Sequence, residues 1–260
     1  MVIQPDGQNS VRLLVIVPAH NEAKSISLAL HDLRVYVPQA DVVVIDDGST
    51  DNTAAIARQG GATVVSLPCN LGVGGAVQTG YMYAYRGGYD VAVQFDGDAQ
   101  HRANQIPKLI AAIVAGRADL VIGSRLLAGR GFRFHPFRFI GSRLLSWLVS
   151  AIVRRRITDP TSGFRAASGR AIAFFAGHYP QTYLADTTEA IVWVGRQGMR
   201  IMEVPTRMRQ RTAGLSATGS VKGLLHVMRI TLALLVDCLE APIEEQEHPS
   251  CRKSSALSSD

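Results

Sequence analysis

The chain has 260 residues, 47% of them hydrophobic, and a formal net charge of +6. This length and apolar content predict a single domain over residues 1–240, followed by a polar, serine-rich and disordered tail over residues 241–260. Arginines concentrated in the second half indicate anionic partners. Nucleic acid is excluded from these because no basic stripe is interleaved with aromatic residues. Three scattered cysteines and an N-terminus without an apolar signal segment predict a reduced, cytoplasmic protein.

Short runs of Val, Ile and Leu alternate with segments of helical period along the first half of the chain. Helices are predicted from about residue 22, after residue 51, from residue 75 and near residue 106. The predicted strands cover residues 11–17, 41–46, 62–67, 89–95 and 118–124. This alternation predicts an α/β fold, a Rossmann-like, mainly parallel sheet flanked by helices.

Polar clusters follow four of these strands. They read "PAHNE" (18–22), "DDGSTD" (46–51), "DGDAQ" (96–100) and "GSR" (123–125). Each cluster alone is typical of a turn or a helix cap. Because the carboxyl ends of parallel strands meet at one edge of a sheet, the four together predict one ligand site.

Asp96 and Asp98 in the third cluster are separated by a single glycine. Two carboxylates this close either share a proton or hold a cation. Mg²⁺ and Mn²⁺ take oxygen ligands from one or two carboxylates and complete their shell with substrate phosphates. Gln100 can add an amide oxygen, so Asp96, Asp98 and Gln100 form a candidate metal site.

The segment "ITDPTSGFRA" in the second half gathers hydroxyls and a guanidinium around a Pro and a Gly. These groups suit a phosphate monoester, which pairs with Arg bidentately. The alternative is a capped turn before a helix that starts at Ser168.

Two apolar segments in the second half of the chain are predicted to form amphipathic helices. One is too short to span a membrane, and the other carries charged residues. Residues 139–156 end in three arginines, and residues 221–239 carry Lys222, His226 and Arg229 at helical spacing. Both patterns favour helices that lie on a membrane surface rather than span it. Packing of either helix on the sheet remains the alternative.

Together "VPAHNE", "IDDGSTD", "NLGVGGAVQTG", "DGDAQH", "GSR" and "DPTSGFRA" resemble the family-2 glycosyltransferases of the GT-A fold, over roughly residues 11–216. The last motif resembles the branch of dolichyl-phosphate mannose synthase and bacterial polyprenyl-phosphate glycosyltransferases. The resemblance implies metal-dependent, inverting transfer of a sugar from a nucleotide-diphospho-sugar donor to a polyprenyl phosphate acceptor. It implies a donor-binding half at about 11–125, an acceptor half at about 126–240, and peripheral attachment to the inner face of the cytoplasmic membrane through the amphipathic helices.

The resemblance also implies roles for individual residues. The ion, Mg²⁺ or Mn²⁺, would be held by Asp96, Asp98 and Gln100. The residues expected to bind the donor are Pro18, Ala19, Asn21, Glu22, Asp47, Ser49, Gly75, Asp96, Arg125 and Arg211. Those expected at the acceptor phosphate are Arg143, Ser162 and Arg165, and those expected to be catalytic are Asp98, Asp159 and Asp186.

Several points stay open at the level of sequence. Family members that act on sugar hydroxyls carry an adjacent Glu-Asp pair, whereas this chain has Asp186 and Glu189 three residues apart. A saccharide or soluble hydroxyl acceptor is therefore the main rival, and a non-catalytic nucleotide-sugar-binding scaffold is a second. The basic loop at 206–216 is either a lid over the donor or a solvated loop. The sugar and the nucleotide base are not defined.

Overall fold

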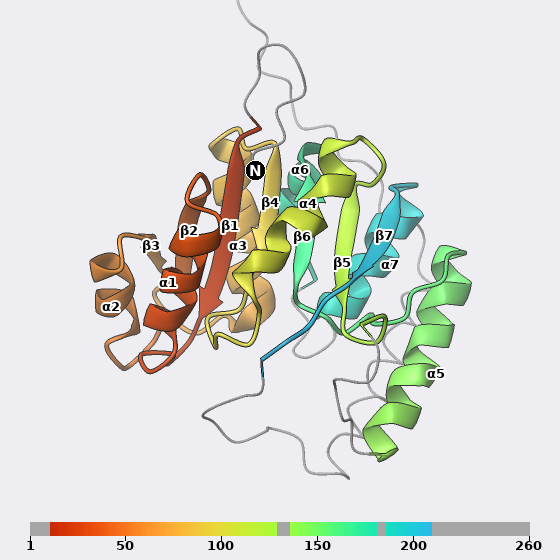
Figure 1. The fold of residues 1–260 in the computed structure, drawn as a ribbon, viewed down its shortest axis with the longest axis horizontal. Coiled ribbons are helices and arrows are strands. Elements are labelled where there is room, and N and C mark those ends of the chain that lie inside the picture. The colour runs from red at the N-terminus through yellow and green to blue at the C-terminus, as the bar shows by residue number, and fades with distance from the viewer. Residues whose placement is uncertain (1–10, 129–135, 181–185, 210–260) are drawn as a thin grey trace, which may run out of the picture.

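The computed structural model describes residues 11–128, 136–180 and 186–209, without the side chains of residues 136–141 and 186. In this part of the chain one 7-stranded sheet runs in the order β3-β2-β1-β4-β6-β5-β7 (Figure 1). Its strands are β1 (Leu13–Ala19), β2 (Asp41–Asp46), β3 (Thr63–Ser66), β4 (Val91–Gln94), β5 (Leu120–Ser124), β6 (Arg165–Ser168) and β7 (Ile201–Pro205).

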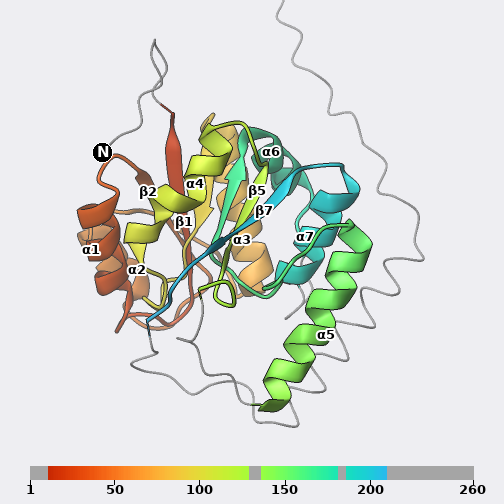
Figure 2. The same cartoon turned by 45° about the vertical axis from the view of Figure 1, so that its right-hand side comes forward.

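Helices cover both faces of the sheet, as Figures 1 and 2 show. They are α1 (Ile26–Tyr36), α2 (Thr53–Gln59), α3 (Gly72–Arg86), the 3₁₀ turn η1 (Ala103–Gln105), α4 (Ile106–Val114), α5 (Pro136–Val153), α6 (Gly169–Gly177) and α7 (Asp186–Arg196). The predicted α/β sandwich is confirmed.

Alternate residues of the central strands feed two separate cores. Leu14 and Ile16 of β1 face a core with α3, α6 and α7, whereas Val15 and Val17 face a core with α1 and α4. Near-continuous apolar strands are expected when both faces of a sheet are covered. Gly80 lets α3 approach β1 closely, since a Cβ there would lie 2.2 Å from Ile16 Cγ2.

Strand β6 departs from the predicted pattern, because it is antiparallel to both of its neighbours. Gln94 of β4 pairs with Arg165, and Ile122 of β5 pairs with the same residue from the other side. The amino end of an antiparallel strand lies where parallel strands end. The loop that precedes β6 therefore reaches the carboxyl edge of the sheet, beside the loops that follow β1, β2, β4 and β5.

The predicted helix start at Ser168 is confirmed, since the Ser168 side chain accepts a hydrogen bond from the Ala171 N–H at the beginning of α6. The predicted amphipathic segment at 139–156 forms most of α5. The second amphipathic segment, the tail and Arg211 lie outside the described residues. Within the described part of the chain, the helices all lack the combination of length and hydrophobicity required to cross a membrane.

Candidate active site

The loops after β1 and β2 are joined by side-chain hydrogen bonds. Asn21 has a φ of 55°, in the left-handed region that Asn tolerates. Its backbone N–H donates to Ser49 Oγ at 3.0 Å, and its side-chain oxygen accepts from the Thr50 N–H at 2.8 Å. The Glu22 N–H donates to Thr53 Oγ1 at 2.8 Å. Asn21, Glu22 and Ser49 thus shape one continuous rim, as their predicted grouping at one site requires.

Asp47 connects this rim to the start of α3. One of its carboxylate oxygens accepts from the Leu71 N–H at 2.7 Å, and the residue is 4% exposed. Gly48 has a φ of +65° and lies against the Cys69–Asn70 backbone, where a Cβ would come within 2.8 Å. Gly75 is buried in the first turns of α3. The loop between β3 and α3 therefore packs tightly on the loop after β2.

The paired carboxylates lie on the loop after β4. Asp98 Oδ1 accepts the Gln100 N–H at 3.0 Å, and Ala99 between them has a φ of 59°. Gly97 packs under Pro18 and Ala19, with a Cβ position 3.3 Å from the Pro18 carbonyl oxygen. This sharp turn keeps Asp96, Asp98 and Gln100 half-buried at the rim.

The described residues contain no group of three or more His, Cys, Asp and Glu side chains arranged as metal ligands. Two carboxylates and an amide suit an ion that also binds substrate phosphates, as Mg²⁺ and Mn²⁺ do. The donor set on this loop therefore fits a divalent cation that arrives with a diphosphate, and would hold it incompletely without one.

His101 supports the paired-carboxylate loop from below. Its Nδ1 accepts the Asp96 N–H at 3.0 Å, which leaves the proton of the neutral ring on Nε2, 3.4 Å from Asp96 Oδ2. The ring stacks on Phe164, with centroids 4.7 Å apart. Burial, together with the charge of Arg125, lowers the pKa of His101 to about 4 against the opposing charge of Asp98. A neutral imidazole thus holds Asp96 by its backbone and faces its carboxylate.

Arg125 and Asp159 form a buried bidentate ion pair. Arg125 Nε donates to Asp159 Oδ2 and Arg125 Nη2 to Oδ1, both at 2.7 Å, and Nη2 also reaches Thr161 Oγ1 at 2.8 Å. Burial disfavours the charged guanidinium, but the bonds and charge of Asp159, with a contribution from Asp96, raise the pKa of Arg125. The expected donor-binding arginine is therefore held beside the paired carboxylates by the expected catalytic Asp159.

Glu203 on β7 fixes the loop that carries Asp159. Its carboxylate accepts the Thr158 N–H at 2.8 Å, the Thr158 hydroxyl at 2.9 Å and the Asp159 N–H at 2.9 Å. The Thr158 and Ser124 hydroxyls are 2.7 Å apart. Burial raises the pKa of Glu203, although its hydrogen bonds act in the opposite direction. This network joins β5, β7 and the loop before β6.

Ser162 and Arg165 lie beneath the loop rather than on its open side. Ser162 Oγ donates to the Gly123 carbonyl at 2.7 Å, and Arg165 donates to the carbonyls of Ser162 and Pro160 at 2.7 and 2.9 Å. Their exposed fractions are 2% and 1%. This placement differs from the expected contact with an acceptor phosphate. Both side chains are buried and hold the turn before β6 through these backbone carbonyls.

The third expected acceptor residue, Arg143, and the carboxylates Asp186 and Glu189 belong to helices α5 and α7. Arg143 is exposed on α5. Asp186 begins α7, and its side chain is outside the described residues. Glu189, one turn further on, is 5% exposed. The structure thus brings Asp159 to the paired-carboxylate loop, and it places Glu189 inside the core.

The segment that follows β7 crosses beside the paired-carboxylate loop. The Arg209 N–H donates to the Gln100 carbonyl at 2.8 Å, and Arg209 Nη1 lies 2.6 Å from Asp32 Oδ2 on α1. Gln105 exchanges two hydrogen bonds with the backbone of Arg207, at 2.6 and 2.8 Å. These contacts fix the described residues of the predicted lid, 206–209, whereas Arg211 of the same loop is outside the described residues.

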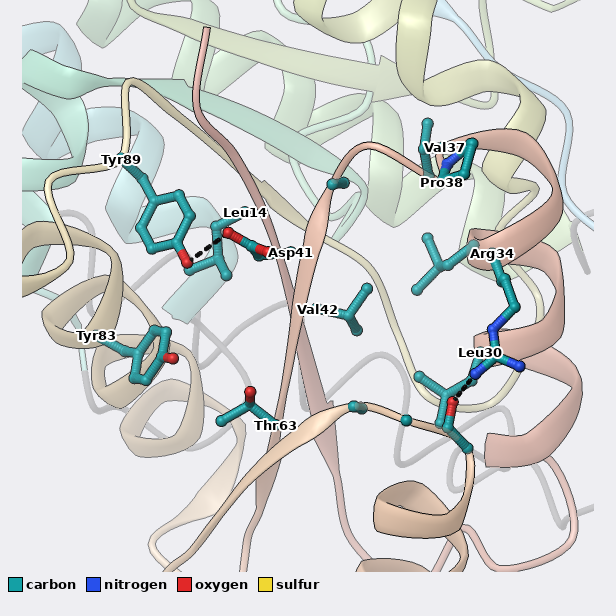
Figure 3. Close-up of a pocket in the computed structure, with 15 residues that line it drawn as sticks. Leu14, Leu30, Arg34, Val37, Pro38, Asp41, Val42, Thr63, Tyr83 and Tyr89 are labelled. Carbon is teal, nitrogen blue, oxygen red and sulfur yellow. Dashed lines mark hydrogen bonds between the residues drawn. The ribbon is translucent and has the colours of Figure 1, made fainter. Parts of the chain in front are cut away.

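A separate cleft of about 350 Å³ opens near the amino ends of β2 and β3 (Figure 3). Asp41 accepts the Tyr89 hydroxyl at 2.8 Å, and Arg34 donates to the Gly60 carbonyl. Burial and the bond to Asp41 raise the pKa of Tyr89 to about 12. The cleft lies at the edge of the sheet opposite the paired carboxylates, and the polar groups that it exposes are engaged with one another.

Sequence reasoning missed His101, Gly163 and Glu203. His101 lies in the motif "DGDAQH" and Gly163 in "DPTSGFRA", so their position beside predicted site residues could have indicated a role for both. A Cβ on Gly163 would lie 3.3 Å from Asp96 Oδ2, which shows how closely the two loops meet. Glu203 is a lone carboxylate in a strand, and only the register of β7 beside β5 reveals its partners.

The α/β sheet, with its polar loops gathered at one edge, was compared with known proteins. The sequence profile described as "Glycosyl transferase family 2" matches residues 14–176. The chain belongs to this family, and it is a glycosyltransferase with the GT-A fold.

Characterised relatives match over most of their length. An undecaprenyl-phosphate mannosyltransferase of Micrococcus luteus is 34% identical over 250 residues, which cover 89% of this chain and 98% of the relative. A polyprenol monophosphomannose synthase of Mycolicibacterium smegmatis is 30% identical, over 79% of this chain and 80% of its own. A UDP-N-acetylglucosamine–dolichyl-phosphate N-acetylglucosaminyltransferase of Methanococcus voltae is 29% identical, over 75% and 84%.

Solved structures agree on the fold. Glucosyl-3-phosphoglycerate synthase from Mycobacterium tuberculosis, in complex with phosphoglyceric acid, aligns with a TM-score of 0.67 at 20% identity over 89% of this chain and 81% of that one. The same enzyme with Mn²⁺, uridine diphosphate and glucosyl-3-phosphoglycerate aligns with a TM-score of 0.65 at 19% identity, over 89% and 81%.

Proposed function

We propose that this glycosyltransferase moves a sugar from a nucleotide-diphospho-sugar donor to the phosphate of a polyprenyl phosphate at the cytoplasmic face of the membrane. The observation that carries the proposal is the meeting of two loops at one edge of the sheet. The paired-carboxylate loop suits a donor diphosphate, and the loop at 158–163 brings the Arg125–Asp159 pair against it. Relatives named for polyprenyl phosphate acceptors match this chain over both loops.

In this proposal Asp96, Asp98 and Gln100 hold Mg²⁺ or Mn²⁺. The ion, when bound, neutralises charge on the leaving diphosphate. The rim formed by Asn21, Glu22, Ser49 and Asp47, with Pro18, Ala19 and Gly75, surrounds the nucleoside. Arg125 lies toward the diphosphate, Arg143 toward the acceptor, and Arg211 closes over the donor.

The transfer is a single displacement that inverts the anomeric carbon. An oxygen of the acceptor phosphate forms the new bond to that carbon while the bond to the donor diphosphate breaks, and the electron pair leaves with the nucleoside diphosphate. Because the second pKa of a phosphate monoester is about 6, the attacking oxygen is anionic at neutral pH and no strong general base is needed. This removes the need for the Glu-Asp pair that the chain lacks.

The test is label transfer from a panel of radiolabelled UDP- and GDP-sugars into butanol-extractable lipid. Purified protein is incubated with polyprenyl phosphate and Mn²⁺ or Mg²⁺, with and without EDTA. We expect a lipid product that EDTA abolishes, and a loss of at least about 10²-fold in Asp98→Asn. Asp41→Asn, at the opposite edge of the sheet, is the control. Transfer to a soluble saccharide in place of lipid would replace the proposed acceptor.

A further inference from the structure

Helix α5 presents three different faces along its length. Leu145 and Val149 are buried at 1% and 0% exposure and pack into the core beside α7. Leu144 and Trp147 point outward and are 52% and 67% exposed. In Figures 1 and 2, α5 lies at the outer side of the molecule, away from the helices that cover β1 to β4. An exposed indole and a leucine on a peripheral helix can contact an apolar partner.

A groove of about 730 Å³ runs along the third face of α5. Its walls include Trp147 and Leu127, and its residues carry only positive charge. The lining side chains are Leu126, Leu127, Arg143, Ser146, Trp147, Ser150, Ala151, Arg154, Arg155, Arg156 and Thr158. Apart from Arg143, the groove has three arginines, no Asp or Glu and an exposed Trp, and this combination is complementary to an anionic, partly apolar surface.

The backbone that follows the arginines is tied to α5 by two serines of the helix. The Ser150 hydroxyl accepts the Ile157 N–H at 2.9 Å, and the Ser146 hydroxyl donates to the Ile157 carbonyl at 2.5 Å. The Arg155 N–H donates to the Ser150 carbonyl at 3.2 Å. The chain thus turns back on the end of the helix, where cations also favour the negative end of its dipole. Arg154, Arg155 and Arg156 are all exposed there.

We infer that this groove binds the phosphate groups of anionic phospholipids, with Trp147 and Leu144 inserted at the interface between head groups and acyl chains. Trp and Leu prefer this depth, and each arginine near an anionic leaflet adds electrostatic attraction. The lipid here is a matrix lipid and not the acceptor of the reaction. The inference deepens the proposed attachment to the membrane by naming the surface and the lipid charge that it requires.

The chain contains only two tryptophans, which makes a direct test possible. In a Trp193→Phe variant, Trp147 is the single fluorescent indole. The protein is mixed with vesicles of phosphatidylcholine alone or of equal parts phosphatidylcholine and phosphatidylglycerol, without donor and without polyprenyl phosphate. We expect co-sedimentation with the anionic vesicles, a blue shift of Trp147 emission, quenching by brominated acyl chains, and weaker binding at high salt.

Charge-reversal variants locate the surface. Arg155→Glu with Arg156→Glu is expected to weaken vesicle binding at least roughly tenfold. Arg86→Glu with Arg117→Glu makes the same change of net charge at exposed sites away from the groove, and is expected to change binding much less.

Several outcomes would overturn the inference. Equal binding to neutral vesicles, equal loss in both charge-reversal pairs, or Trp147 emission that lipid leaves unchanged each contradict it. The inference is also contradicted if the protein binds an oligonucleotide but not vesicles, and if the Arg155→Glu, Arg156→Glu variant loses that oligonucleotide binding. A protein that binds vesicles but transfers no sugar retains this inference and loses the proposed function. A protein that transfers sugar to detergent-solubilised polyprenyl phosphate but does not bind vesicles retains the proposed function and loses this inference.

Discussion

At the scale of single residues, Glu203 combines burial with several hydrogen bonds to the loop that carries Asp159. It accepts three hydrogen bonds from Thr158 and Asp159, and burial nevertheless raises its pKa. Burial and the hydrogen bonds therefore oppose each other in their effect on the pKa of Glu203. Glu203 positions Arg125 through Asp159, because Asp159 accepts hydrogen bonds from Nε and Nη2 of Arg125.

Glu203→Gln is expected to lower kcat by about 10²-fold while the melting temperature changes little, because a small displacement of Arg125 is costly for catalysis. The amide has one acceptor oxygen, and its NH₂ group must face backbone N–H donors. Steady-state kinetics against donor concentration are the measurement. Asp41→Asn, on a strand at the other edge of the sheet, is the matched control. A variant with unchanged kcat would show that Glu203 only stabilises the fold.

Asp119 gives a pH dependence that can be worked out. The Arg200 side chain hydrogen-bonds its carboxylate and lowers the pKa of Asp119 below the usual 3.8. A carboxyl with a lowered pKa stabilises the fold above the unfolded pKa, and this contribution is lost as the pH falls through the folded pKa. Asp119→Asn is therefore expected to be less stable than the wild type at pH 7, and the difference should shrink below pH 3.8. Urea denaturation across pH measures both; a constant difference would refute the assignment.

At the scale of elements, the decisive contact is between two loops. Gly163, in the loop before β6, leaves space for the Asp96 carboxylate, and a Cβ there would lie 3.3 Å from Oδ2 and 3.4 Å from Oδ1. Its backbone does not need glycine for a positive φ. Close approach of the loops is therefore the reason for glycine at this position.

Gly163→Ala is expected to move Asp96 by a few tenths of an ångström and to weaken Mn²⁺ binding by roughly tenfold in the presence of UDP or GDP, whichever the label-transfer panel identifies as the donor nucleotide. Electron paramagnetic resonance of free Mn²⁺ gives the affinity without turnover. Gly177→Ala is the control, because a Cβ there meets nothing within 4 Å. Equal Mn²⁺ affinity in both variants would argue against Asp96 as a ligand.

The sequence predicted the parallel strands and the grouping of their loops well, since long Val- and Ile-rich runs have few other structures. It did not predict β6, because "RAAS" is a run of four residues without a strand pattern. The same omission affected the site. Ser162 and Arg165 have the chemistry of phosphate ligands, but in the turn before β6 and at its first residue both are buried and bonded to backbone carbonyls. Residue type is visible in sequence, whereas side-chain direction depended on a strand that was not recognised.

At the scale of the whole molecule, three distant parts of the chain converge on the paired-carboxylate loop. Asp32 of α1 binds Arg209, the Arg209 backbone binds Gln100, and Gly163 arrives from the loop before β6. Groups that are remote in sequence have no spacing signal, so these contacts could be found only in the structure. They also tie the described residues of the predicted lid, 206–209, to the paired-carboxylate loop.

The position of β6 has a consequence for how the chain folds during synthesis. Strands β4 and β5 have no bond with each other, and β6, made later, is the partner that joins them. A nascent chain that has emerged only as far as β5 therefore has an open edge on β4 and no place for β5. Unpaired edges of this kind invite aggregation and chaperone binding. The first 125 residues, which carry most of the expected donor ligands, thus depend on a later strand to join β5 to the rest of their sheet.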